Sequence, residues 1–184
     1  SEADGAIDAA LAAGYAGQVT DRVGGVGNAG TDTLQNVVAI RGSLFDDRIA
    51  AANRAMTIEG SGGDDMITGS TQSDLFIWRS GDGEDALVGG DGNDTVEFVD
   101  RQNADAAWTL TALTADSAQL EDGTHATSFA GVEFVRLMTA DGSDRVTIDG
   151  VDGASEIRWI HVALGDGDDT LTAATSAVPI EAFG

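Results

Sequence analysis

The chain has 184 residues, enough for one ordinary domain or two small ones, and its 32 acidic residues against nine basic ones give a formal charge of −23. A surface this negative repels phosphate backbones and anionic lipids, which excludes a nucleic-acid-binding protein or a polybasic membrane module. The absence of cysteine excludes disulfides and thiolate metal sites, and no apolar run approaches the roughly 18 residues of a membrane span. The natural partner of so many carboxylates is a cation.

High net charge also favours an unfolded chain. A hydrophobic content of 42%, much of it alanine, argues against permanent disorder. We therefore expect a chain that self-repulsion keeps unfolded until cations neutralise it. The 25 glycines and single proline predict many tight turns and few helices.

The first 23 residues form a lead-in segment rich in alanine and glycine. Residues 7–13 fit either a short helix that ends at Gly14 or a strand, and their periodicity does not separate these alternatives.

Residues 24–99 follow a nine-residue register, clearest from 42 to 97. A two-residue insertion, Trp78-Arg79, interrupts it and is expected to form a bulge or a widened corner. The eighth position of each block is apolar: Ile49, Ile58, Ile67, Phe76, Leu87 and Val96. The sixth position is aspartate except at Met56: Asp47, Asp65, Asp74, Asp85 and Asp94. A shorter block at 27–35 places Asp32 in the sixth position, and later blocks at 139–147 and 164–172 place Asp144 and Asp169 there.

The physical roles of these positions are separable. Glycines allow the backbone to turn with φ > 0, and the last three residues of a block form a short strand with one inward side chain. Because one block cannot bury that side chain alone, two blocks should form a rung of about 18 residues, with rungs stacked about 4.8 Å apart. Stacking places Asp47, Asp65 and Asp85 along one edge, and Asp74 and Asp94 along the other.

Stacked carboxylates repel one another unless a divalent cation lies between them. Calcium fits best because it accepts six to eight oxygen ligands and tolerates mixtures of carboxylates and backbone carbonyls. Magnesium requires octahedral geometry and retains its water, so it fits a carbonyl-rich cage less well.

The block GGDGNDTVE at 89–97 resembles the G-G-x-G-x-D-x-U-x nonapeptide of the RTX, or haemolysin-type, calcium-binding repeat family. Residues 32–34, 41–43 and 46–49 are also similar to the lead-in of such repeats in large secreted bacterial proteins. The resemblance implies an all-β fold, a parallel β-roll or β-solenoid with calcium between neighbouring turns. The implied carboxylate ligands are Asp32, Asp47, Asp65, Asp74, Asp85, Asp94, Asp144 and Asp169. The implied carbonyl donors are Ser61, Gly63, Gly81, Gly83, Gly90, Gly92 and Gly167.

Residues 100–137 break the register and are expected to form a small non-repeating β insertion. Two alternating stretches, 107–113 and 131–137, flank a hairpin turn at 121–123. Residues 138–184 return to the repeat as a second set of rungs, in which a 25-residue offset matches Leu137 with Val162. Because residues 180–184 resemble 58–62, we expect the chain to stop within a repeat and to belong to a larger parent protein.

No EF-hand loop occurs, and neither His125 nor His161 lies in a metalloprotease motif, so we expect no enzyme activity from this chain. The leading hypothesis is a calcium-triggered structural module of a secreted or cell-surface bacterial protein, such as an adhesin, a surface-layer protein or a toxin. It would bind neither nucleic acid nor a membrane interior, and a cell-surface or carbohydrate partner remains open. Two alternatives also remain open: an accessory module of a secreted protease, lipase or polysaccharide epimerase, and a carbohydrate-binding module that uses residues 98–137.

Overall fold

The computed structural model describes residues 7–12, 16–21, 31–35, 37–51, 53–151, 156–174 and 176–184, with the backbone alone for the first three ranges. All regular structure within these ranges is β. No helix long and apolar enough to cross a membrane occurs among them.

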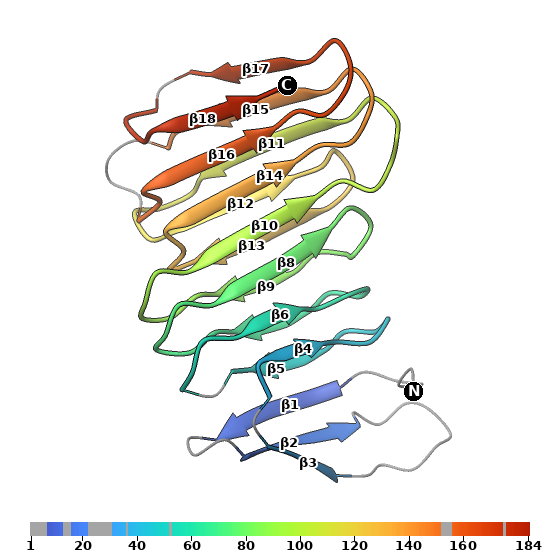
Figure 1. Cartoon of the computed structure of the whole chain (residues 1–184), viewed down its shortest axis with the longest axis vertical. Helices are drawn as coiled ribbons and strands as arrows, with labels where there is room; N and C mark the ends of the chain where they lie inside the picture. Colours follow the sequence, from blue (N-terminus) through green and yellow to red (C-terminus); the bar gives the residue numbers. More distant parts are fainter. Residues whose placement is uncertain are drawn as a thin grey trace.

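The strands form two sheets that extend along the long axis of the molecule, with β1–β3 at one end and β17 and β18 at the other (Figure 1). Sheet A contains, in spatial order, β17 (Thr170–Ala173), β15 (Arg145–Asp149), β11 (Ala107–Ala112), β12 (Ser117–Glu121), β13 (Ala126–Ala130), β9 (Ala86–Val88), β7 (Met66–Thr68), β5 (Arg48–Ala50), β1 (Ile7–Ala12), β2 (Ala16–Asp21) and β3 (Thr31–Gln35). Sheet B contains β18 (Ile180–Phe183), β16 (Trp159–Ala163), β14 (Phe134–Met138), β10 (Thr95–Val99), β8 (Leu75–Arg79), β6 (Thr57–Glu59) and β4 (Ala39–Arg41).

From β4 to β10 successive strands alternate between the sheets, and each pairs in parallel with the strand two elements further on. Every strand from β5 to β10 begins at the seventh position of a nine-residue block, as the sequence predicts. The eighth-position side chains are all at most 3% exposed. Because one side chain per short strand faces inward, the two sheets bury these residues in one shared core.

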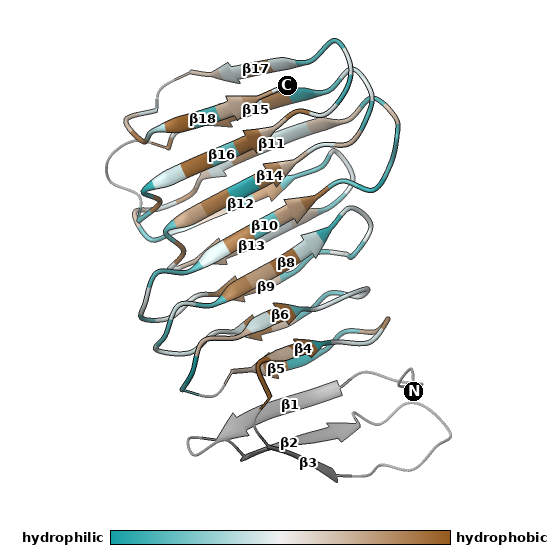
Figure 2. Cartoon of the chain, in the orientation of Figure 1, coloured by the Kyte–Doolittle hydropathy of each residue, from teal (hydrophilic) through white to brown (hydrophobic). Residues whose placement is uncertain are grey.

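The centre of the core is aromatic. Trp78 lies 5.8 Å from Phe98 and 6.0 Å from Trp108, between ring centroids, and Phe98 lies 5.8 Å from Phe129. Hydrophobic residues concentrate on the strands, whereas the turns between them are largely hydrophilic (Figure 2). The fold therefore leaves the acidic turns at the two edges of the stack.

The insertion Trp78-Arg79 does not produce the bulge or widened corner that a strict nine-residue register requires. Instead it lengthens β8 to five residues and adds Trp78 to the core, and β10 lengthens to match. A turn in which the Asp82 amide donates to the Arg79 carbonyl at 2.8 Å then restores the register.

The break in the repeat is an antiparallel excursion within sheet A, formed by β11, β12 and β13. β13 pairs in parallel with β9, and β11 pairs in parallel with β15, so the excursion joins the two halves of the sheet. In sheet B the stack continues directly from β10 to β14 and β16, with Leu137 opposite Val162 as predicted. The antiparallel part thus spans 107–130, and β14 already belongs to the parallel stack.

At the other end, β1 is a strand, which settles the alternative left open for residues 7–12, and it pairs with β5 and β2. Asp32 lies within β3, opposite Val19 of β2, and not at the turn that the block at 27–35 predicts. The physical reason is that residues 31–35, Thr-Asp-Thr-Leu-Gln, include two β-branched threonines, which favour a strand, and this strand pairs with β2. The glycine-containing part of that block, residues 27–30, lies outside the described residues.

Candidate functional site

The sixth-position aspartates of sheet A form a column, as their spacing predicts. Asp65 Oδ1 accepts a hydrogen bond from the Asp47 amide at 2.7 Å, and Asp85 Oδ1 accepts one from the Asp65 amide at 3.0 Å. All three side chains are at most 4% exposed. The carboxylates of Asp65 and Asp85 therefore each bridge their own turn to the preceding one.

Sheet B carries a second column built in the same way. Asp74 Oδ1 accepts from the Met56 amide, and Asp94 Oδ1 accepts from the Asp74 amide, each at 2.7 Å. In the later blocks Asp144 Oδ1 accepts from the Ala106 amide at 2.8 Å, and Asp169 Oδ1 accepts from the Asp144 amide at 2.9 Å.

The second carboxylate oxygen divides these turns into two kinds. Asp47 Oδ2 and Asp74 Oδ2 each accept the amide of a serine in their own turn, Ser43 and Ser70, at 2.5 Å. The Oδ2 atoms of Asp65, Asp94 and Asp144 are buried and have no hydrogen-bond partner within the described part of the chain. A buried anionic oxygen without a donor is costly, so these turns present an unfilled position for a proton or a cation.

Within blocks 42–97 the backbone conformation at the second position differs in the same way, whereas Ala140, at the second position of the Asp144 block, is not in the positive-φ region. Ser61, Gly81 and Gly90 have φ of 77°, 91° and 107°, whereas Ser43 and Ser70 are not in the positive-φ region. The three second-position residues with positive φ are among the seven predicted carbonyl donors. The other four donors also have positive φ: Gly63, Gly83, Gly92 and Gly167.

Carbonyl oxygens at the second and fourth positions point along the stack toward the next turn. A Cβ on Gly83 would overlap the carbonyl oxygen of Gly63, one on Gly167 would overlap that of Gly142, and one on Gly90 would overlap that of Ser70. The gap between two turns therefore has carbonyl oxygens of one turn on one side, and the sixth-position carboxylate of the next turn reaches across to an amide of the first.

Burial and mutual repulsion raise the pKa values of these carboxylates. Loss of solvation is the main cause for Asp65, whose pKa rises to about 8 despite the hydrogen bond from the Asp47 amide, and Asp85 and Asp47 raise it further. The same causes raise the pKa of Asp85 to about 7 and that of Asp94 to about 6. Without a cation, the folded chain therefore retains protons that exposed aspartates would release.

These shifts predict that the chain without bound cations is more folded in mild acid than at pH 8. A carboxyl group whose folded pKa lies above its unfolded value contributes stability that is present below the unfolded pKa and is lost as pH rises through the folded one. For Asp65 this range extends from 3.8 to about 8. Far-UV circular dichroism in EDTA should show the β signal growing as pH falls from 8 toward 5. A signal that weakens over this range would contradict the raised pKa values of the buried aspartates.

The donor set fits an ion that accepts mixed oxygen ligands. Among the described residues no three histidine, aspartate, glutamate or cysteine side chains converge on one point. A centre built from side chains alone therefore finds no support here. Calcium instead accepts backbone carbonyls beside one or two carboxylates, which is the combination that lines these gaps.

The sequence interpretation missed Glu133. It precedes β14, is 6% exposed, and its Oε2 accepts a hydrogen bond from the Asp94 amide at 2.7 Å, so it continues the sheet B column where the repeat has ended. The available signal was an acidic residue two places before an apolar residue of a strand, Glu133 before Val135, without the glycines of the repeat.

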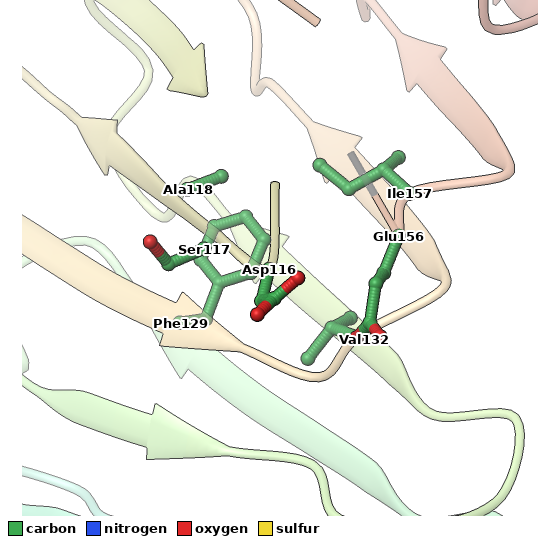
Figure 3. Close-up of a pocket in the computed structure, with 7 residues that line it drawn as sticks. All are labelled: Asp116, Ser117, Ala118, Phe129, Val132, Glu156 and Ile157. Carbon is green, nitrogen blue, oxygen red and sulfur yellow. The ribbon is translucent and has the colours of Figure 1, made fainter. Parts of the chain in front are cut away.

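Other polar features of the described residues provide no comparable site. His125 faces Asp122 of its own hairpin at 3.6 Å, and His161 lies 3.9 Å from Glu181. Figure 3 shows a small hollow beside β12 and β13, with Phe129 and Val132 in its wall and the exposed Asp116 and Glu156 near it. Its free space is close to that of one water molecule, too little for an organic ligand.

A search against protein-family models finds none that matches the chain, and a search of curated proteins likewise finds no match.

Proposed function

We propose that this chain is a calcium-binding structural module, a parallel β-roll that folds when calcium fills the gaps between its stacked turns. The observation that carries the proposal is the buried, unpartnered Oδ2 of Asp65 and Asp94 in columns of carboxylates. The nine-residue register, its positive-φ glycines and the carbonyls that point between turns support membership of the RTX family.

The ion pairs of the described residues do not neutralise the negative charge of these carboxylate columns. Glu59 pairs with Arg41, Arg79 and Arg101, and Glu97 pairs with Arg136, all on strands or turns away from the sixth-position carboxylates. Within the described residues, no arginine forms an ion pair with Asp65, Asp85 or Asp94. A dissolved divalent cation supplies the missing charge.

The open and self-capped turns should differ in calcium binding. At Asp47 and Asp74 a serine amide already satisfies Oδ2, whereas Asp65 and Asp94 have room for an ion there. We therefore assign the strongest sites of the repeat to the gaps closed by Asp65 and Asp94, with Asp144 and Asp169 forming a separate site in the later rungs.

The biological role follows from mass action. Extracellular calcium modules bind with dissociation constants of about 10⁻⁴–10⁻³ M, so such a chain remains unfolded where calcium is scarce and folds once exported. The role is that of a structural segment of a secreted or cell-surface bacterial protein, such as an adhesin, a surface-layer protein or a toxin. The alternative of an accessory module in a secreted protease, lipase or epimerase uses the same calcium chemistry and places the catalytic residues in another part of the parent.

The proposal of a carbohydrate-binding module in residues 98–137 gains no support from three of the four aromatic side chains there. Phe98, Trp108 and Phe129 are at most 2% exposed, so their rings are not available to stack on sugars.

The test is a circular-dichroism titration of EDTA-treated protein at pH 7.5 with calcium and, separately, with magnesium. We expect a cooperative gain of β signal with calcium at submillimolar to millimolar concentration and little gain with magnesium. A chain that is fully β-folded in EDTA and unchanged by calcium would contradict the proposal.

A further inference from the structure

Beyond the repeat, one acidic residue from the connection between β13 and β14 enters the sheet B column. Residues 131–133 join the two strands without a nine-residue turn, yet Glu133 lies in register with Asp94, because Phe134 pairs with Thr95. Its Oε2 accepts from the Asp94 amide at 2.7 Å, as sixth-position aspartates do elsewhere in the stack. The longer glutamate side chain thus reproduces the contact of the repeat without its turn.

Oxygen atoms from both sides converge in this gap. Asp94 is 0% exposed, and its Oδ2 has no hydrogen-bond partner among the described residues. Asp94 Oδ2 and the carbonyl oxygen of Gly131 both lie within 2.7 Å of the position that a Cβ on Gly89 would take, so they face the same small space. The Gly90 carbonyl oxygen lies 3.5 Å from the corresponding position on Gly131.

Among the described residues, no positively charged side chain forms an ion pair that neutralises the negative charge of this cluster. Arg158, whose amide donates to the Glu133 carbonyl, directs its guanidinium to Asn93 Oδ1 at 3.0 Å, and no ion pair joins it to Asp94 or Glu133 in the described structure. The unpartnered Asp94 Oδ2 and the two carbonyl oxygens repel one another in this space, beside the buried Glu133 carboxylate, unless a cation lies between them.

We propose that Asp94, Glu133 and the carbonyl of Gly131 form a calcium site of their own, outside the nonapeptide repeat, which links the repeat to the strands beyond the insertion. This inference rests on the proposed calcium function and adds a ligand that the repeat does not supply. A carboxylate of glutamate can hold calcium through both oxygens, and the carbonyls complete the set of hard ligands.

The test compares calcium stoichiometry by isothermal titration calorimetry in the wild-type chain, Glu133→Gln and Glu97→Gln. Glutamine retains an oxygen that accepts the Asp94 amide but removes the charge, and circular dichroism in saturating calcium checks that the variant folds. Glu97→Gln is the matched control, because Glu97 on neighbouring β10 pairs with Arg136 at the surface.

We expect Glu133→Gln to bind one calcium ion fewer per chain, or to bind that ion at least about tenfold more weakly, and Glu97→Gln to match the wild type. An unchanged stoichiometry and affinity in Glu133→Gln, while the wild type binds calcium, would overturn this site and leave the proposed function standing. A wild-type chain that binds no calcium would instead overturn the proposed function.

Discussion

Asp65→Asn is expected to raise the calcium concentration for half-maximal folding by about tenfold or more, since even residues that only support metal ligands are worth about 10–100-fold in affinity. Asp65 is 2% exposed, its Oδ1 holds the Asp47 amide, and its Oδ2 is the unpartnered oxygen that faces the gap. Asparagine retains an acceptor for the Asp47 amide, so the change removes mainly the charge.

The matched control is Asp64→Asn in the same turn. Asp64 is exposed, and its Oδ1 accepts the Glu84 amide at 3.0 Å, an interaction that asparagine also retains. We expect its midpoint to lie within about twofold of the wild type. Calcium titrations followed by circular dichroism measure both variants, and equal shifts in the two would indicate a diffuse charge effect and contradict ion binding by the column.

Gly83→Ala is expected to be strongly destabilising. Gly83 has φ of 126°, which alanine adopts at a cost of about 1–3 kcal/mol, and its new Cβ would overlap the carbonyl oxygen of Gly63 in the preceding turn. Because that oxygen belongs to backbone, the two turns must separate, at a further cost of about 1–3 kcal/mol.

Gly81→Ala separates the two costs. Gly81 also has positive φ, 91°, but a Cβ there meets nothing within 4 Å. Urea unfolding in saturating calcium should therefore show a loss about 2 kcal/mol smaller than that of Gly83→Ala. Equal losses in the two variants would mean that turn stacking contributes no more than backbone strain.

The nine-residue register predicted the strands and columns because each position has one physical requirement. Ile49 and Ile67 must face inward, and Asp47 and Asp65 must then lie above one another, since parallel neighbours one rung apart place equivalent residues side by side. The 25-residue offset predicted the pairing of Leu137 with Val162 for the same reason.

Features without a period were not predictable in this way. Trp78 extends β8 instead of forming a bulge. Burial of its large indole ring stabilises the fold more than a strict nine-residue repeat would. Asp32 matches the sixth position of the motif in sequence, but it lies within β3, which pairs antiparallel with β2 and so does not form a turn there. Glu133 could not be found from the repeat, because sheet pairing across the insertion brings it beside Asp94 from 39 residues away.

The most direct test of the account is a crystal structure grown in calcium, with anomalous difference density measured at a long wavelength. The account predicts peaks between neighbouring turns, within calcium–oxygen distance of about 2.3–2.6 Å from the carboxylates of Asp65 and Asp94 and from turn carbonyls. Gaps that hold no anomalous peak in a calcium-saturated crystal, with these carboxylates protonated or turned to solvent, would contradict it.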